Sequence, residues 1–198
     1  MRYDVVAMDD RSRHAREAVL ATTVELLREL GVERLSIERV AARSGVAKTT
    51  IYRHWPGKAD LVVDAVRSCV RPVPTPNTGD VRADLLACLC GLRDAVVDTG
   101  MARILPSLLD AAQRDPDFAD LFERLHDERD LPVRTVLELA QLRGELDPDV
   151  DLDAAVDLVV GPLLLRMLVT HAPLPDETVA FVVDRVLRGL GATSPAAR

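Results

Sequence analysis

The stretch from Ser36 to Lys58 has the spacing of two short helices that pack across a tight turn. Ala41 is small enough to let a second helix approach closely, and Gly45 can adopt the positive φ that such a turn requires. Ile51 can then fill the core shared by the two helices, and Ser36 stands where the first helix needs an N-cap. The spacing therefore predicts a helix-turn-helix, which limits what the rest of the chain can fold into.

The second helix of this motif is expected over residues 47–54, and one of its faces is polar. At about 100° per residue, Ile51 points inward while Thr49 and Arg53 point to the opposite side. The outer face is completed by Lys48, Thr50 and Tyr52. Side chains of these types can donate to base edges and phosphates and are poor material for a protein core. A DNA-reading face and a solvated face of a small bundle are both compatible with this pattern alone.

The whole stretch resembles the DNA-binding domain of the TetR family of bacterial transcriptional regulators. The resemblance rests on the run GVAKTTIYRHWPGKADL (residues 45–61), which is preceded by LSIERVA and by a helix expected over 13–30. It covers about the first seventy residues. Within the run, one spacing of aromatic, histidine and lysine side chains is specific to the family, and it is formed by Tyr52, His54, Trp55 and Lys58. The resemblance implies a protein that binds double-stranded DNA.

The same resemblance assigns DNA contacts to individual positions. Bases are expected to be contacted from Lys48, Thr49 and Thr50, and phosphates from Tyr52, His54 and Lys58. Ser36 is expected to open the preceding helix against the DNA backbone, and Arg53 joins the predicted contacts because it lies on the outer face. Glu38 is not included, because an acid is unfavourable near phosphates.

The charge of the chain is unevenly distributed. Its net charge of −7 argues by itself against binding to nucleic acid. However, residues 11–58 hold ten lysines and arginines against five glutamates, a local charge of +5, whereas residues 71–198 hold thirteen basic and twenty-two acidic residues, a local charge of −9. A basic N-terminal part joined to an acidic remainder is typical of a DNA reader with a separate regulatory domain.

Composition and local patterns exclude several other classes of protein. The longest apolar run, 158–165, is far shorter than the ~18 residues that a membrane span requires, and the N-terminus lacks a signal pattern, so a cytoplasmic location is expected. Glycine-rich phosphate loops, nucleophile motifs and paired metal-binding cysteines are absent from the sequence, so neither catalysis nor a cofactor or metal ion is predicted. The three cysteines, Cys69, Cys88 and Cys90, are interpreted as structural thiols.

The remainder of the chain has helical periodicity throughout, and the predicted fold class is all-α. A proline-rich segment that starts at residue 71 divides the chain into residues 1–70, with a helix-turn-helix core at 11–58 and a linking helix at 58–70, and a regulatory and dimerisation domain at 71–198. Further helices are expected over 80–98, 101–114, 116–144 (with a kink or restart at Pro132), 153–171 and 178–190.

Residues 153–171 are apolar on nearly all sides, so both faces of this helix must be covered. A second apolar stripe follows in residues 178–190. Two such helices that meet their symmetry mates would form a four-helix homodimer interface, and the family resemblance implies the same; the alternative is a central helix buried within one monomer. A dimer would also place two recognition helices about 34 Å apart, which suits a palindromic operator.

The resemblance further implies a cavity among the middle helices that holds a small-molecule effector. Candidate lining residues are Cys90, Met101, Leu105, Phe122, His126, Arg166 and Met167, although all could equally be ordinary core or surface positions. Arg166 is a charge in an otherwise apolar helix and needs a partner, either an acid or an anionic ligand.

Taken together, these features predict a transcriptional regulator, specifically a repressor that binds a palindromic operator as a homodimer and is released by a small molecule. One alternative is a regulator of the same fold that responds to a protein partner instead of a small molecule. A second alternative, from a different class, is a helical ligand carrier or enzyme whose basic N-terminal part is incidental.

Overall fold

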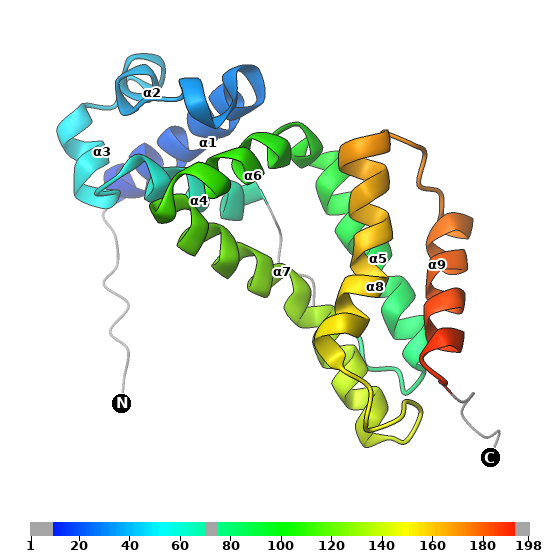
Figure 1. Cartoon of the computed structure of the whole chain (residues 1–198). Coiled ribbons are helices and arrows are strands. Elements are labelled where there is room, and N and C mark those ends of the chain that lie inside the picture. The colour runs from blue at the N-terminus through cyan, green and yellow to red at the C-terminus, as the bar shows by residue number, and fades with distance from the viewer. Residues whose placement is uncertain (1–9, 70–74, 193–198) are drawn as a thin grey trace, which may run out of the picture. The chain divides into compact units, whose positions relative to one another are not determined.

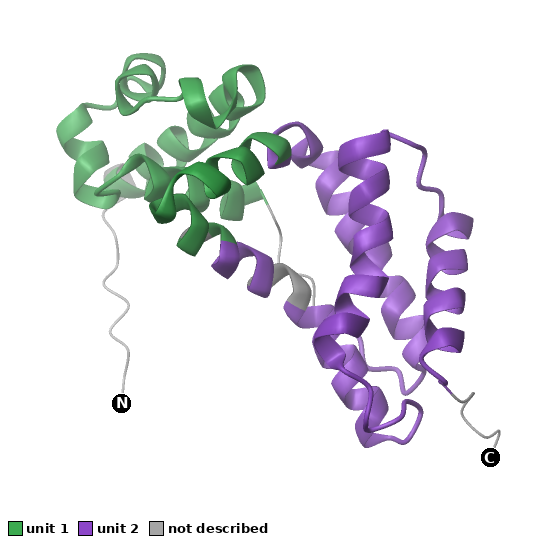
Figure 2. Cartoon of the chain, in the orientation of Figure 1, with its two compact units in different colours: residues 1–70, 106–122 green, residues 71–105, 123–198 purple. Residues whose placement is uncertain are grey.

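The computed structural model describes residues 10–69 and 75–192, and within them the secondary structure is helical, without strands (Figure 1). The described residues form two compact units (Figure 2). The first unit contains residues 10–69 together with 106–122, and the second contains 75–105 and 123–192. The all-α fold class predicted from the sequence is confirmed. The predicted domain boundary between residues 70 and 71 lies outside the described residues.

Four helices open the first unit: α1 (Asp10–Arg34), α2 (Ile37–Ser44), α3 (Lys48–His54) and α4 (Lys58–Cys69). Helix α1 contacts the other three, and α2 contacts α3. Their shared core consists of side chains that are almost completely buried, among them Val19, Leu27, Val40, Ile51, Trp55, Leu61 and Val62. Ile51 is 0% exposed, so the recognition helix α3 is held by the one face that the sequence predicted to point inward.

The start and the end of α2 are formed by the residues that the sequence indicated. Gly45 ends α2 with φ 72°, and its N–H donates to the carbonyl of Ala41. The Ser36 hydroxyl accepts a hydrogen bond from the Arg39 N–H at 3.3 Å and so caps the start of α2. Gly31 has φ 73° and interrupts α1, although the helix resumes for one turn beyond it. Only glycine adopts these left-handed conformations without strain.

A segment far along the chain also belongs to the first unit. It comprises α6 (Leu105–Arg114) from Pro106 onward and the beginning of α7 (Pro116–Leu142). The N–H of Val32 donates to the Ser107 hydroxyl at 3.3 Å, and a Cβ on Gly31 would lie 3.3 Å from the Ser107 Cβ. Because of this close approach, a side chain at Gly31 would be crowded as well as strained.

The second unit contains α5 (Val81–Asp98), the remainder of α7, α8 (Leu152–Leu164) and α9 (Asp176–Gly189). Helix α9 packs against both α5 and α8. The core is again aliphatic, with buried side chains that include Leu85, Leu89, Val136, Leu137, Val159, Leu163, Val179 and Val183.

Three predicted helices differ in detail. The helix expected over 101–114 is instead a 3₁₀ turn, η1 (Met101–Arg103), followed by α6, because Pro106 has no N–H and cannot continue a helix that begins at Met101. The helix expected over 153–171 is α-helical only to Leu164 and continues as a π-helical segment, η2 (Leu165–Thr170). Helix α7 continues through Pro132 without a restart, which was one of the two outcomes expected there.

One carboxylate joins three helices of the first unit. Asp64 on α4 accepts a hydrogen bond from the indole N–H of Trp55 at 3.0 Å and from the guanidinium of Arg16 on α1 at 2.9 Å. The Arg16 guanidinium also lies 5.7 Å from the centroid of the Trp55 ring. Trp55 is 2% exposed and follows the last residue of α3, so Asp64 anchors the end of the recognition helix to α1 and α4.

We predict that Asp64→Ala lowers the free energy of unfolding of the first unit by about 1–3 kcal/mol, because it leaves the buried Trp55 N–H without its acceptor. Asp64→Asn keeps an oxygen acceptor and loses mainly the partly exposed ion pair, so it should cost less than about 1 kcal/mol. Urea unfolding followed by Trp55 fluorescence measures both changes, since Trp55 is the single tryptophan of the chain.

The control is Glu17→Ala, which removes an exposed acid of α1 and should change stability by at most about 0.5 kcal/mol. Equal stability of Asp64→Ala and the control would contradict the anchoring role of Asp64.

Candidate nucleic-acid interface

Helix α3 carries an exposed polar face opposite the buried Ile51. Lys48, Thr49, Tyr52 and Arg53 are exposed, and Thr50 is half-buried. These are five of the six predicted contact residues of this helix, and the sixth is His54. Ser36 is half-buried at the start of α2, where its hydroxyl caps the helix. Such a face can present donors to base edges and to the DNA backbone.

His54, a predicted phosphate contact, is placed differently from the exposed residues of α3. Its Nε2 is buried and has no hydrogen-bond partner among the described residues. The ring lies against Trp55, with the two ring centroids 5.5 Å apart. A phosphate contact from His54 therefore requires either its other ring nitrogen or a change of rotamer.

Lys58 is a predicted phosphate contact that lies beyond α3. It begins α4 and is half-buried. Its ammonium donates to the carbonyl of Glu33 at 3.3 Å. Burial lowers the pKa of Lys58, and the nearby carboxylates of Asp115 and Glu33 oppose this shift. Lys58 also lines a cleft of about 350 Å³ within the first unit, beside Glu33, Ser107 and Asp115. Its ammonium has two further N–H donors with which it can contact a phosphate.

Glu38, an acidic residue that is not among the predicted contacts, lies beside the exposed polar face of α3. The Lys48 ammonium donates to the Glu38 carboxylate at 3.1 Å, which links the first residue of α3 to the first turn of α2. The pKa of Glu38 is lowered, first by a hydrogen bond to its own backbone N–H and then by Lys48. The two residues are ten positions apart, so only the packing of α2 on α3 reveals the contact.

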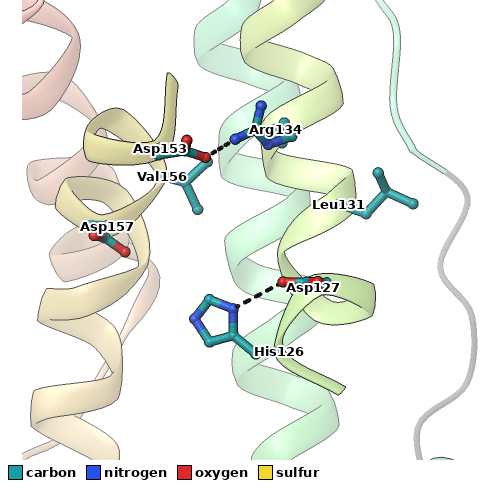
Figure 3. Close-up of a pocket in the computed structure, with 7 residues that line it drawn as sticks. All are labelled: His126, Asp127, Leu131, Arg134, Asp153, Val156 and Asp157. Atoms are coloured by element: carbon teal, nitrogen blue, oxygen red, sulfur yellow. Dashed lines mark ion pairs between the residues drawn. The ribbon is translucent and has the colours of Figure 1, made fainter. Parts of the chain in front are cut away.

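The second unit has a cleft of about 370 Å³ between α7 and α8 (Figure 3). Its lining residues are His126, Asp127, Leu131, Arg134, Asp153, Val156 and Asp157. Arg134 and Asp153 form an ion pair across the cleft, and His126 lies 3.8 Å from Asp127. In Figure 3, His126 points toward α8 and Leu131 points away from it.

Of the seven residues predicted to line an effector cavity, His126 lines this cleft and the other six do not. Met101 and Met167 are buried, Cys90 and Leu105 are half-buried, and Phe122 belongs to the first unit. Arg166 donates twice to the carbonyl of Pro173, at 3.1 and 2.8 Å. A main-chain carbonyl is therefore the partner of Arg166 within the chain, in place of the acid that was one of the two expected partners.

The cysteines behave as ordinary thiols in the structure. Burial raises the pKa of Cys88 to about 11 and also raises the pKa values of Cys69 and Cys90.

Among the described residues, there is no cluster of three or more acids, histidines or cysteines suited to a metal ion. The helices within residues 10–69 and 75–192 are too short or too polar to cross a membrane.

The last helices of the second unit expose large apolar side chains. Along α8 and η2, Leu158, Leu165 and Val169 are 53%, 53% and 67% exposed, and Phe181 on α9 is 58% exposed. The opposite side of α8 is buried, with Val159 and Leu163 at 0% exposure. These helices therefore have one face in the core of the unit and carry large apolar side chains that are more than half exposed.

Known proteins match both halves of the chain. Residues 19–65 match the family described as bacterial regulatory proteins of the tetR family, and residues 75–186 match the tetracyclin repressor-like C-terminal domain. The DNA-binding transcriptional repressor TetR of Mycobacteroides abscessus is 34% identical, over 86% of this chain and 90% of its own length. The HTH-type transcriptional regulator YdeS of Bacillus subtilis is 28% identical over 93% of each chain.

A solved structure agrees with these matches. The crystal structure of the TetR family transcription regulator SCO0332 is 38% identical to this chain and superimposes with a TM-score of 0.68, covering 89% of this chain and 98% of that one. The relatives are transcriptional regulators and not enzymes. With the helix-turn-helix and its exposed polar face in place, the two family matches and these relatives show that the chain belongs to the TetR family of DNA-binding transcriptional regulators.

Proposed function

We propose that this regulator represses transcription by binding a palindromic operator as a homodimer, with α3 of each protomer in the major groove. The observation that carries the proposal is the exposed polar face of α3, held in place by the buried Ile51 and by the Trp55–Asp64 hydrogen bond. Lys48, Thr49 and Thr50 are proposed to contact bases. Phosphates are proposed to be contacted from Ser36, Tyr52, Arg53, His54 and Lys58.

Dimerisation is proposed to occur through α8, η2 and α9. Association with a second copy would remove the exposed apolar side chains Leu158, Leu165, Val169 and Phe181 from water. A short recognition helix contacts few base pairs, so a single protomer would have little specificity. Two protomers related by a two-fold axis read two half-sites about one helical turn apart.

The α7–α8 cleft supports the further proposal that a small molecule releases the operator. Its volume of about 370 Å³ is within the range of small-molecule sites, and its walls carry both signs of charge. A 100-fold loss of operator affinity requires about 2.7 kcal/mol of differential binding by the effector. A regulator of the same fold that responds to a protein partner is the alternative, and it needs no occupied cleft.

We predict that the protein selects a palindromic sequence from a random duplex pool and that single substitutions on α3 weaken binding to the selected site. Lys48→Ala and Thr49→Ala should each cost about 1–3 kcal/mol and relax the base preference at one position of each half-site. Tyr52→Phe should weaken binding to all sequences by a similar factor, because its hydroxyl is proposed to contact a phosphate. Affinity measured by fluorescence anisotropy checks these outcomes.

Arg124→Ala is the matched control, because it also removes one exposed positive charge but lies in the second unit. Recovery of sequences without any palindrome would contradict the proposed operator. Unchanged affinity of the Lys48 and Thr49 variants would contradict the proposed base contacts.

We predict that Leu158→Glu combined with Phe181→Glu converts the protein from a dimer to a monomer in sedimentation equilibrium, since two carboxylates would replace apolar contacts at the proposed interface. The control is Leu142→Glu at the end of α7, where the leucine is 83% exposed and outside that interface. The control should remain dimeric. A double variant that sediments as a dimer would show that these helices do not form the interface.

We predict that Asp157→Trp, which fills the α7–α8 cleft from an exposed position, abolishes release of the operator by any effector found in a compound screen. Operator affinity without effector should stay within about twofold of the original protein, a difference of less than about 0.5 kcal/mol. Leu142→Trp, outside the cleft, should leave the effector response intact. If Asp157→Trp is released as readily as this control, the effector site lies elsewhere.

A further inference from the structure

The exposed polar face of α3 has an ion pair at its N-terminal end. The Lys48 ammonium and the Glu38 carboxylate are 3.1 Å apart, and their side chains are 51% and 57% exposed. Lys48 is the first residue of α3, and Glu38 lies in the first turn of α2. The pair thus joins the two helices of the motif while both charged groups stay accessible to a ligand.

The chemistry of the pair sets limits on what Lys48 can bind. A lysine held by a carboxylate adds no net positive charge, so it contributes little to the attraction of phosphates that drives non-specific binding. A free carboxylate at this edge would repel phosphates, whereas a paired one is neutralised. A glutamate carboxylate is ionised at neutral pH, and the hydrogen bonds from its own backbone and from Lys48 lower the pKa of Glu38 further.

The arrangement of donor and acceptor matches one kind of base pair. In the major groove, guanine presents two adjacent acceptors, O6 and N7, and its partner cytosine presents the N4 amino donor beside them. Lysine is a preferred donor to guanine, and glutamate accepts from the cytosine amino group. In an A·T base pair, the adenine N6 donor lies between the adenine N7 and thymine O4 acceptors, and thymine adds a methyl group. This pattern suits the Lys48 and Glu38 side chains less well.

We propose that Glu38 is a specificity-determining residue that acts together with Lys48 to read one G·C base pair in each half-site. Lys48 donates to the guanine O6 or N7, and Glu38 accepts from the cytosine N4 amino group. This inference rests on the proposed function, in which α3 enters the major groove. It gives a direct DNA contact to Glu38, which is left out of the predicted contacts because an acid is unfavourable near phosphates.

A second ion pair on the same unit provides the matched control. Arg43 on α2 donates twice to Glu29 of α1, at 2.6 and 2.7 Å, and Glu29 is about as exposed as Glu38. Glu29→Gln and Glu38→Gln each remove one carboxylate from an arginine or lysine of the helix-turn-helix. They differ because Arg43 is not on the recognition helix.

The test uses the full-length chain in four forms: original, Glu38→Gln, Lys48→Met and Glu29→Gln. Each form is first used to select bound duplexes from a random pool. Its affinity is then measured for the preferred site and for a site in which the proposed G·C pair of each half-site is replaced by A·T. The original protein and Glu29→Gln should prefer G·C at that position by roughly tenfold or more. Glu38→Gln and Lys48→Met should each reduce this preference to about twofold or less, with Trp55 fluorescence confirming that each variant is folded.

The salt dependence of binding adds an independent readout. In Glu38→Gln the released Lys48 is free to pair with a phosphate, so the slope of log affinity against log salt should become steeper by about one. If Glu38→Gln keeps the same base preference as Glu29→Gln, the inference is overturned while the proposed operator binding stands. If the original protein selects no palindrome, the proposed function fails and this inference fails with it.

Discussion

The recognition helix depends on a few buried contacts for its existence. Helix α3 has seven residues, and isolated helices of that length are not stable in water. It is held by Ile51, which is completely buried, and by Trp55, whose indole N–H is bound by Asp64 of α4. With its inner side fixed in this way, the outer side is free to carry polar residues that contribute nothing to the core.

The features that could be predicted from the sequence are those determined by near neighbours in the chain. Ser36 caps the helix that follows it, Gly45 adopts the positive φ that its turn requires, and Ile51 faces inward because of its helical position. Each of these roles depends on residues within about one turn of helix. The all-α fold and the side-by-side placement of polar residues on α3 follow from the same local periodicity.

The features that could not be predicted depend on contacts between residues far apart in sequence. The Ser107 hydroxyl accepts from Val32, which brings residues 106–122 into the first unit, and no local pattern indicates this contact. The sequence indicates that Arg166 needs a partner but not which one. Its partner is the carbonyl of Pro173, which is positioned by the π-helical segment and the turn after it. The burial of His54 Nε2 likewise depends on how α3 is packed rather than on its spacing.

The position of the ion pairs changes the meaning of the positive charge counted along residues 11–58. Lys48 and Arg43, two of its ten cations, are paired with Glu38 and Glu29, so the local charge of +5 rests on the other eight cations against the remaining three glutamates. Under the proposed function, those eight cations supply the general attraction to phosphates. The paired Lys48 contributes mainly through directional contacts with bases, which favours discrimination between sequences over tight binding to any sequence.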